Sequence, residues 1–256
     1  MLSRRLTFTV QAGTMAVLQQ YGGDDMIWLT GDTHGHFDHV EDFCRAHDTT
    51  RSDTLILLGD AGFNFGGGER DLALKTRASA FPITILSLHG NRENRPQNIP
   101  GYVEGTFCGG SVLYEPQFPN LLFAIDGEVY RFGGRDCLVV GGAYSTGKEY
   151  RLARGLGWWP DEQPSEAVKR RVEVLLAARG WQMDVVLTHT CPLRYKPLEA
   201  LKKDLDQSTV DSTTEQWMDK IEENLRYAHW YCGHFHTDKR VGRLHILYHT
   251  FEPFPA

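Results

Sequence analysis

Five short polar segments of this chain combine residue types that bind metal ions. Together they carry two aspartates, one asparagine and four histidines beside glycines, and four of them directly follow an apolar or β-branched run. The segments are Gly31-Asp32-Thr33-His34-Gly35, Gly59-Asp60, Gly90-Asn91-Arg92-Glu93, Thr188-His189 and Gly233-His234-Phe235-His236. Oxygen and imidazole donors without a thiolate suit Mn²⁺, Fe²⁺ or Zn²⁺. This set nearly suffices for two ions, and a two-metal centre indicates in-line displacement at a phosphate ester.

Each segment offers a different kind of ligand. The Asp-x-His spacing of Asp32 and His34 can place a carboxylate and an imidazole on one ion. Asp60 is suited to bridging two ions because a carboxylate has two oxygens with free lone pairs. Asn91 offers a neutral carbonyl oxygen, and the fold must bring in the imidazoles of the later residues, His189, His234 and His236. A Gly-Asp turn or a lone histidine is common by itself, so the prediction rests on all five segments together.

The elements between these segments indicate how they converge. Apolar runs at 26–30, 54–58 and 83–88 alternate with helical patterns at 37–47 and 69–80, which predicts parallel β-α-β units. In such sheets the functional loops lie beyond the carboxyl ends of the strands. The first three polar segments stand in those positions, so we expect their side chains to meet at one edge.

The rest of the chain predicts a second group of strands. Asp126-Gly127 separates two β-rich runs and is a strong hairpin signal, so we expect an antiparallel meander over 121–140. Residues 141–163 are predicted to be a polar, aromatic loop and 191–212 an irregular insertion. Further helices are predicted over 165–179 and 214–226, with strands at 184–187, 229–232 and 244–248. The expected fold is α/β: two mixed sheets packed together and flanked by helices, in four α/β/β/α layers.

Length and composition predict one domain with no membrane span. The chain has 256 residues, of which 41% are hydrophobic, and this is enough for one sizeable core. We expect residues 26–256 to form the domain and residues 1–25 to be a disordered or dispensable extension. Polar residues interrupt the apolar stretch after Arg5, which argues against a secretory signal. No apolar run approaches the roughly 20 residues that a membrane-spanning helix requires.

Charge and cysteine usage narrow the expected partners and location. The formal net charge is −6 and basic residues are dispersed, so we expect neither a nucleic-acid groove nor membrane binding. Five cysteines without a Cys-x-x-Cys spacing indicate reduced thiols in a cytoplasmic protein.

The order of the five segments resembles the calcineurin-like metallophosphoesterase superfamily over about residues 26–250. The resemblance is strongest to bacterial and phage-type members, which carry a stretch similar to Gly141-Gly142-Ala143-Tyr144-Ser145. It implies the four-layer fold and a metal-bridging hydroxide that attacks phosphorus between ions about 3.5–4 Å apart. We expect Mn²⁺ in both positions, with Fe, Zn or Ni as alternatives. The resemblance assigns one ion to Asp32, His34, Asp60 and His236, and the other to Asp60, Asn91, His189 and His234.

Arg92 departs from the pattern of this superfamily. The usual run is Gly-Asn-His-Glu or Gly-Asn-His-Asp, whose histidine binds the phosphate and protonates the leaving oxygen. A guanidinium, with a pKa above about 12, donates no proton near pH 7, but it can bind phosphate oxygens through two N–H groups. Three outcomes stay open: a leaving group that departs unprotonated, as from an aryl phosphate or phosphoanhydride; a proton from His36 or His39; or slow or absent catalysis.

We therefore predict a metal-dependent hydrolase of a phosphodiester or an activated phosphomonoester. Its substrate would be a small phosphate ester, with nucleotides and phosphoproteins also compatible. Arg92 and His36 are the expected catalytic residues, and Arg92, Lys148, Arg151 and Asn64 are the expected substrate contacts. The alternatives are a protein phosphatase with the same metal chemistry, a catalytically weakened binding protein, and a nuclease. The absence of a stripe of basic residues argues against a nuclease that acts on long nucleic acids.

Overall fold

The computed structural model describes residues 16–19, 25–201 and 206–255, and its strands form two sheets. The larger sheet has eight strands in the order β1-β5-β6-β7-β4-β3-β2-β14. Its central strands β2, β3, β4 and β7 run parallel, as the sequence predicts for the first three. The strands are β1 Ala16–Gln19, β2 Ile27–Thr30, β3 Thr54–Leu57, β4 Thr84–Ser87, β5 Val103–Phe107, β6 Gly110–Tyr114, β7 Leu121–Ala124 and β14 Glu252–Pro253.

The second sheet has six strands in the order β12-β13-β11-β10-β9-β8. Strands β9, β10, β11 and β13 are parallel, and an antiparallel strand closes each edge. The strands are β8 Val129–Phe132, β9 Arg135–Val140, β10 Val185–Thr188, β11 His229–Cys232, β12 Lys239–Val241 and β13 Leu244–Ile246.

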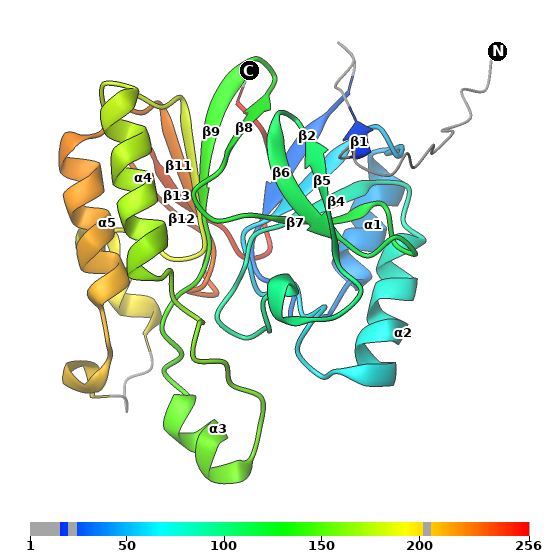
Figure 1. Ribbon diagram of the computed structural model, residues 1–256, viewed down its shortest axis with the longest axis horizontal. Coiled ribbons are helices and arrows are strands. Elements are labelled where there is room, and N and C mark those ends of the chain that lie inside the picture. Colours follow the sequence, from blue (N-terminus) through cyan, green and yellow to red (C-terminus); the bar gives the residue numbers. More distant parts are fainter. Residues whose placement is uncertain (1–15, 20–24, 202–205, 256) are drawn as a thin grey trace.

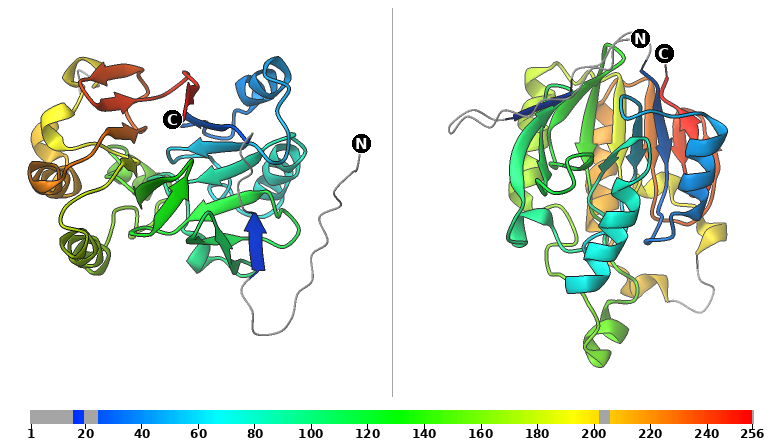
Figure 2. Two further views of the ribbon diagram at one scale, coloured as in Figure 1. Left: turned by 90° about the horizontal axis from the view of Figure 1, so that it is seen from above. Right: turned by 90° about the vertical axis from the view of Figure 1, so that its right-hand side faces the viewer.

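Helices cover the outer faces of both sheets, which confirms the predicted four-layer α/β/β/α fold. Helices α1 (Asp38–Ala46) and α2 (Gly68–Ser79) lie against the eight-stranded sheet. Helices α4 (Glu166–Ala178) and α5 (Thr213–Asn224) lie against the six-stranded sheet, on the opposite side of the molecule (Figures 1 and 2). The remaining helical turns are short: α3 Lys148–Arg154 and the 3₁₀ turns Pro96–Asn98, Leu193–Tyr195, Leu198–Ala200 and Gln207–Thr209.

Three hydrophobic layers hold these elements together. Side chains on a strand point alternately to the two faces of the sheet. In β3 this alternation directs Leu55 and Leu57 to the layer under α1 and α2, whereas Ile56 faces the other sheet. Because both faces are covered, the strand is an uninterrupted apolar run rather than an alternating one. The strands that lead to the polar segments are therefore the most deeply buried part of the fold.

The prediction of one antiparallel meander over 121–140 is wrong for its first strand. Strand β7 belongs to the eight-stranded sheet, beside β4 and β6, whereas β8 and β9 form a hairpin in the six-stranded sheet. Asp126-Gly127 therefore carries the chain from one sheet to the other. Asp126 accepts hydrogen bonds from Gly141 N at 2.6 Å and from Arg95 Nη1 at 2.6 Å. The pair still forms a local turn, closed by the Glu128 N–H donating to Ile125 O at 3.2 Å, and the long-range contacts of Asp126 fix where that turn lies between the sheets.

Three further segments differ from, or extend, the sequence-based expectations. Helix α3 lies inside the segment predicted as a loop, and the β5-β6 hairpin was not predicted. Residues 191–212 are irregular as predicted, with 3₁₀ turns in their described part. Ala16–Gln19, within the predicted extension, form β1 and pair with β5. Residues 1–15 and 20–24 of that extension lie outside the described residues, and its dispensability stays a prediction.

The cysteines form no disulfide framework. All five are free and buried, as their spacing predicts. Across the part of the chain that the structure describes, no helix is both long and apolar enough to cross a membrane.

Candidate metal centre

All seven predicted ligands lie in loops that follow parallel strands. Asp32 and His34 follow β2, Asp60 follows β3, and Asn91 follows β4, three adjacent strands of the eight-stranded sheet. The other three ligands follow two adjacent strands of the six-stranded sheet, β10 for His189 and β11 for His234 and His236. The carboxyl ends of these five strands lie at the same edge of the sandwich. Side chains separated by up to about 200 residues in the sequence therefore meet there.

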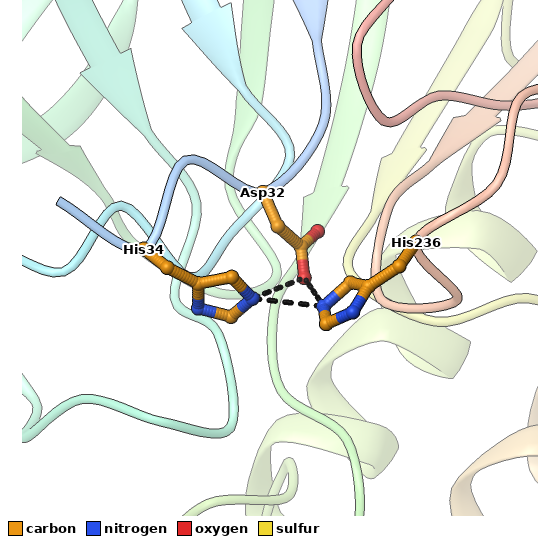
Figure 3. Close-up of side chains that lie close together, drawn as sticks. All are labelled: Asp32, His34 and His236. Carbon is orange, nitrogen blue, oxygen red and sulfur yellow. Dashed lines mark hydrogen bonds and ion pairs between the residues drawn. The ribbon is translucent and has the colours of Figure 1, made fainter. Parts of the chain in front are cut away.

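The first group of donors consists of Asp32, His34 and His236 (Figure 3). Asp32 Oδ2 lies 3.6 Å from His34 Nε2 and 3.2 Å from His236 Nε2, and the two imidazole nitrogens are 2.8 Å apart. The Asp32 carboxylate is buried, and its Oδ2 has no well-formed hydrogen bond among the described residues. One carboxylate oxygen and two ring nitrogens converging on one point are a suitable donor set for a divalent cation.

The second group is built around Asn91. Its Oδ1 lies 2.9 Å from His189 Nε2 and 3.0 Å from His234 Nδ1. His189 Nδ1 donates a hydrogen bond to Leu58 O at 2.7 Å, which leaves a lone pair on Nε2. Asn91 Nδ2 donates to Ser145 Oγ at 2.7 Å, which directs Oδ1 toward the histidines. Two acceptors therefore face each other at 2.9 Å, an arrangement that a cation between them would stabilise.

Asp60 lies between the two groups, as its predicted bridging role requires. Its Oδ2 is 3.7 Å from His34 Nδ1, and its Oδ1 is 3.9 Å from His189 Nε2. The Arg92 backbone N–H donates to Asp60 Oδ1 at 2.8 Å, which holds the carboxylate in place. Asp60 is almost fully buried, so its charge is poorly screened by water.

The backbone around the ligands is strained and closely packed. Four ligands have a left-handed backbone conformation: His34 (φ 49°), Asp60 (φ 49°), His234 (φ 70°) and His236 (φ 51°). Such conformations cost about 1–3 kcal/mol each and concentrate at functional sites. Gly90 is needed for a different reason, because a Cβ there would lie 2.0 Å from Asp60 Oδ1. The loops thus approach the carboxylates more closely than any side chain would permit.

The surroundings of Asp32 and His234 favour the protonation states that bind cations. Burial raises the pKa of Asp32, but its contact with His236 and the nearby His189 and His34 lower it to about 2. Burial lowers the pKa of His234 to about 3. Near pH 7 the carboxylate is therefore ionised and the His234 imidazole is neutral, with a lone pair to donate. Together with the acceptor contacts, these states are compatible with the binding of divalent metal ions by these residues.

A cleft of 670 Å³ opens beside the metal centre. Asp60, Asn91, His234 and His236 form part of its wall. Of the predicted substrate contacts, Arg92 and Arg151 line the cleft. The metal ligands are therefore accessible to a ligand of moderate size, with two guanidinium groups in the same space.

The other predicted substrate and acid residues lie elsewhere. Lys148 Nζ lies over the Trp158 ring, 4.5 Å from its centroid. Asn64 is buried, and its Oδ1 accepts a hydrogen bond from Tyr102 at 2.9 Å. His36 is exposed, and neither it nor His39 is among the residues that line the cleft. The roles predicted for these residues stay predictions.

The structure also reveals site residues that sequence reasoning did not assign. Ser145 Oγ accepts a hydrogen bond from Asn91 Nδ2 and donates one to the backbone oxygen of Asn91 at 3.0 Å. Its own N–H donates to buried Glu162, whose other oxygen accepts from Trp158 Nε1 at 2.8 Å. Lys196 and Glu215 line the cleft, and burial raises the pKa of Glu215. Ser145 stands in the stretch that carries the family resemblance, but no local pattern links the others to the ligands.

We expect Ser145→Ala to weaken Mn²⁺ binding and lower activity by about 10- to 100-fold, because Asn91 would lose the contact that orients its amide. The measurement is a Mn²⁺ titration by calorimetry alongside kcat and KM. Thr76→Ala removes an exposed hydroxyl on α2, outside the cleft lining, and serves as the control. Unchanged Mn²⁺ affinity in Ser145→Ala would show that Asn91 needs no such support.

One comparison, that with protein families, agrees with this geometry. The family model described as calcineurin-like phosphoesterase matches residues 26–238, which include all seven ligands. No curated protein sequence matches the chain. Among solved structures, TT1561 of Thermus thermophilus is similar, with 14% sequence identity and a TM-score of 0.48, over 90% of this chain and 98% of that one. A protein of unknown function from Aquifex aeolicus, AQ665, has 13% identity and a TM-score of 0.32, over 65% and 81% of the two chains.

The structural similarities are distant and add nothing about activity, whereas the family model spans most of the chain and both halves of the donor set. Members of this family hydrolyse phosphoesters with divalent metals, which is the chemistry that the two groups of donors support. The chain belongs to the calcineurin-like phosphoesterase family.

Proposed function

We propose that the protein is a dinuclear-metal phosphoesterase that hydrolyses a phosphodiester or an activated phosphomonoester. The supporting observation is the position of Asp60, whose two oxygens face different donor groups. A carboxylate in that position can hold two ions close together. We further propose Mn²⁺ as the metal, because carboxylate, amide and imidazole donors without thiolate suit it. Bound there, the two ions would activate a water molecule for attack on phosphorus and stabilise the charge on the phosphate oxygens.

The protein's own residues would orient the substrate. Arg92 lines the cleft next to the ligand Asn91, so its guanidinium can bind phosphate oxygens through two N–H groups. It cannot act as a general acid near pH 7. The preferred substrates are therefore those whose leaving group departs without a proton. Loss of general acid catalysis lowers the rate by typically about 10²–10⁴-fold and leaves metal-assisted hydrolysis measurable.

We expect Mn²⁺-dependent hydrolysis of both p-nitrophenyl phosphate and bis-p-nitrophenyl phosphate by the purified full-length chain. Treatment with EDTA should abolish turnover, and excess Mn²⁺ should restore it, because the donor groups bind the ions through side chains that a chelator can outcompete. The ratio of kcat/KM for the two substrates distinguishes a phosphodiesterase from a phosphomonoesterase.

The opposite outcome is also informative. If neither these two substrates nor any other phosphate compound is hydrolysed with Mn²⁺, Fe²⁺, Zn²⁺ or Ni²⁺, the enzyme assignment is wrong. Arg92, in place of a proton donor, is the feature that would favour a protein that binds metal and ligand without turnover. The protein-phosphatase alternative is tested in the same assay with a phosphoserine peptide.

A further inference from the structure

Three guanidinium groups surround one aromatic ring at the edge of the metal centre. The carbon atoms of the Arg70, Arg92 and Arg151 guanidiniums lie 5.9, 5.9 and 5.4 Å from the centroid of the Phe65 ring. These arginines come from α2, the loop after β4, and α3. A cation over an aromatic ring is attracted to it, but three cations around one ring also repel each other.

No ion pair neutralises these three arginines within the described residues. None of the three arginines has a carboxylate oxygen within 4 Å there, whereas several other arginines of the protein do. Arg151 is 8% exposed, and its side chain donates a hydrogen bond to Gly157 O at 3.1 Å. Arg92 Nε is buried without a hydrogen-bond partner among the described residues. Arg151 is thus a buried charge without a carboxylate partner, which is costly, whereas Arg92 is half-buried and Arg70 is exposed at the rim of the cluster. An anion bound beside Arg92 and Arg151 would supply the missing negative charge.

Two of the three arginines and Phe65 share one cleft with the metal centre, and Arg70 lies outside its lining. Phe65, Arg92 and Arg151 line it together with Asp60 and His234. Burial lowers the pKa of Arg151, as does the charge of Arg92, whereas Asp60 and Glu162 act in the opposite direction. An anion bound by the arginines would thus lie beside a phosphate held at the metal ligands.

We propose that Arg92, Arg151 and Arg70, arranged around Phe65, form a second anion subsite that binds the leaving phosphate of a phosphoanhydride substrate, such as a nucleoside diphosphate. This inference rests on the proposed function, because the phosphate that is attacked is the one at the metal centre. It also explains the arginine at position 92, since a leaving phosphate needs no general acid.

The reaction consumes one water molecule. The water oxygen forms a new bond to the phosphorus at the metal centre, and the bond from that phosphorus to the bridging oxygen breaks. The electron pair of that bond stays on the bridging oxygen, which becomes a terminal oxygen of the leaving phosphate. The second pKa of a phosphate monoester is about 6, so this group leaves as an anion near pH 7 and the protons of the water are shared between products and solvent. The arginines bind the negative charge that develops.

The kinetic test compares ADP with bis-p-nitrophenyl phosphate in the Mn²⁺-loaded full-length protein. We expect Arg151→Gln to lower kcat for ADP by at least about 10³-fold, the lower limit for an arginine that stabilises phosphoryl transfer. Its rate on the diester, which has no second phosphate, should change far less. Arg151→Lys should have an intermediate effect on ADP, because it keeps the charge but not the two-pronged guanidinium. The control is Arg154→Gln, an exposed arginine on the same helix that stacks on Tyr150.

A binding test does not depend on turnover. Calorimetry measures the affinity of the Mn²⁺-loaded protein and its variants for imidodiphosphate and for orthophosphate. We expect imidodiphosphate to bind more tightly, and Arg151→Gln to weaken it by about 10- to 100-fold, the loss that corresponds to a hydrogen bond to a charged group. Thermal melting confirms that each variant is folded.

Two results would overturn the inference. One is an equal fall in activity on ADP and on the diester in Arg151→Gln. The other is imidodiphosphate binding that is no tighter than orthophosphate binding, or that is unaffected in Arg151→Gln. If the parent hydrolyses no phosphate compound, the proposed function fails, and the binding measurement alone then decides whether the second anion subsite exists.

Discussion

Replacing Asp60 by alanine should reduce phosphoesterase activity by at least about 1,000-fold. The physical reason is the position of the carboxylate, whose oxygens face His34 at 3.7 Å and His189 at 3.9 Å. Without it, each donor group loses an anionic ligand, and two cations close together lose the negative charge between them. Metal ions contribute several kcal/mol of transition-state stabilisation, and each 1.4 kcal/mol corresponds to a factor of about ten in rate.

Two measurements check this prediction. The first is kcat on bis-p-nitrophenyl phosphate at saturating Mn²⁺, and the second is the Mn²⁺ content of the purified protein by elemental analysis. Asp42→Ala is the matched control, because Asp42 is an exposed aspartate of α1 whose ion pair is with neighbouring Arg45. Asp60→Ala protein that stays within about tenfold of the parent rate would sink the two-metal assignment.

The second large effect concerns stability rather than catalysis. Asp126→Ala should lower the free energy of unfolding by about 3 kcal/mol, the lower end for a broken buried ion pair, because Arg95 keeps only its longer contact with the more exposed Asp161, at 3.7 Å. The Asp126 side chain is 3% exposed. It forms an ion pair with Arg95 Nη1 at 2.6 Å and also accepts a hydrogen bond from the Gly141 N–H. Burial makes both losses costly, since no water can replace the missing carboxylate.

Urea unfolding in EDTA, which removes any contribution from bound metal, measures the effect as a change in midpoint at constant slope. The control is Asp136→Ala. Asp136 also pairs with arginines, Arg179 at 2.7 Å and Arg131 at 3.5 Å, but its side chain is partly exposed. Surface ion pairs contribute about 0–1 kcal/mol, so this variant should unfold almost like the parent. Equal destabilisation of the two variants would show that burial of Asp126 does not determine its contribution.

Asp126 also shows why part of the fold could not be predicted from the sequence. An Asp-Gly pair between two β-rich runs has the same local signature in a hairpin and in a crossover between sheets. The difference lies in Arg95 and in Gly141, which are 31 and 15 residues away. No local sequence pattern identifies such distant partners. For this reason the sequence predicts the wrong sheet for β7, the strand before the pair.

The substrate-binding residues were underdetermined for a similar reason. Lys148 and Arg151 are three residues apart and of like charge, so composition alone cannot separate them. In the structure α3 places Lys148 over Trp158 and Arg151 against Phe65, inside the cleft. Arg70, far from both in the sequence, joins the same cluster. A charge cluster assembled from three segments has no signature in any one of them.

The convergence of the candidate metal ligands, in contrast, follows largely from the sequence itself. Each candidate ligand lies shortly after a strand that is buried on both faces. Such strands are nearly continuous apolar runs and can therefore be recognised in the sequence. Parallel strands bring their carboxyl ends to one edge, so the order of elements already implies that Asp32, Asp60 and Asn91 meet. Tertiary structure alone decided how the two sheets face each other, which oxygen of Asp60 faces which histidine, and which arginines enter the cleft. Strand ends follow from local hydrophobicity and chain direction, whereas those contacts depend on packing between segments that are distant in the chain.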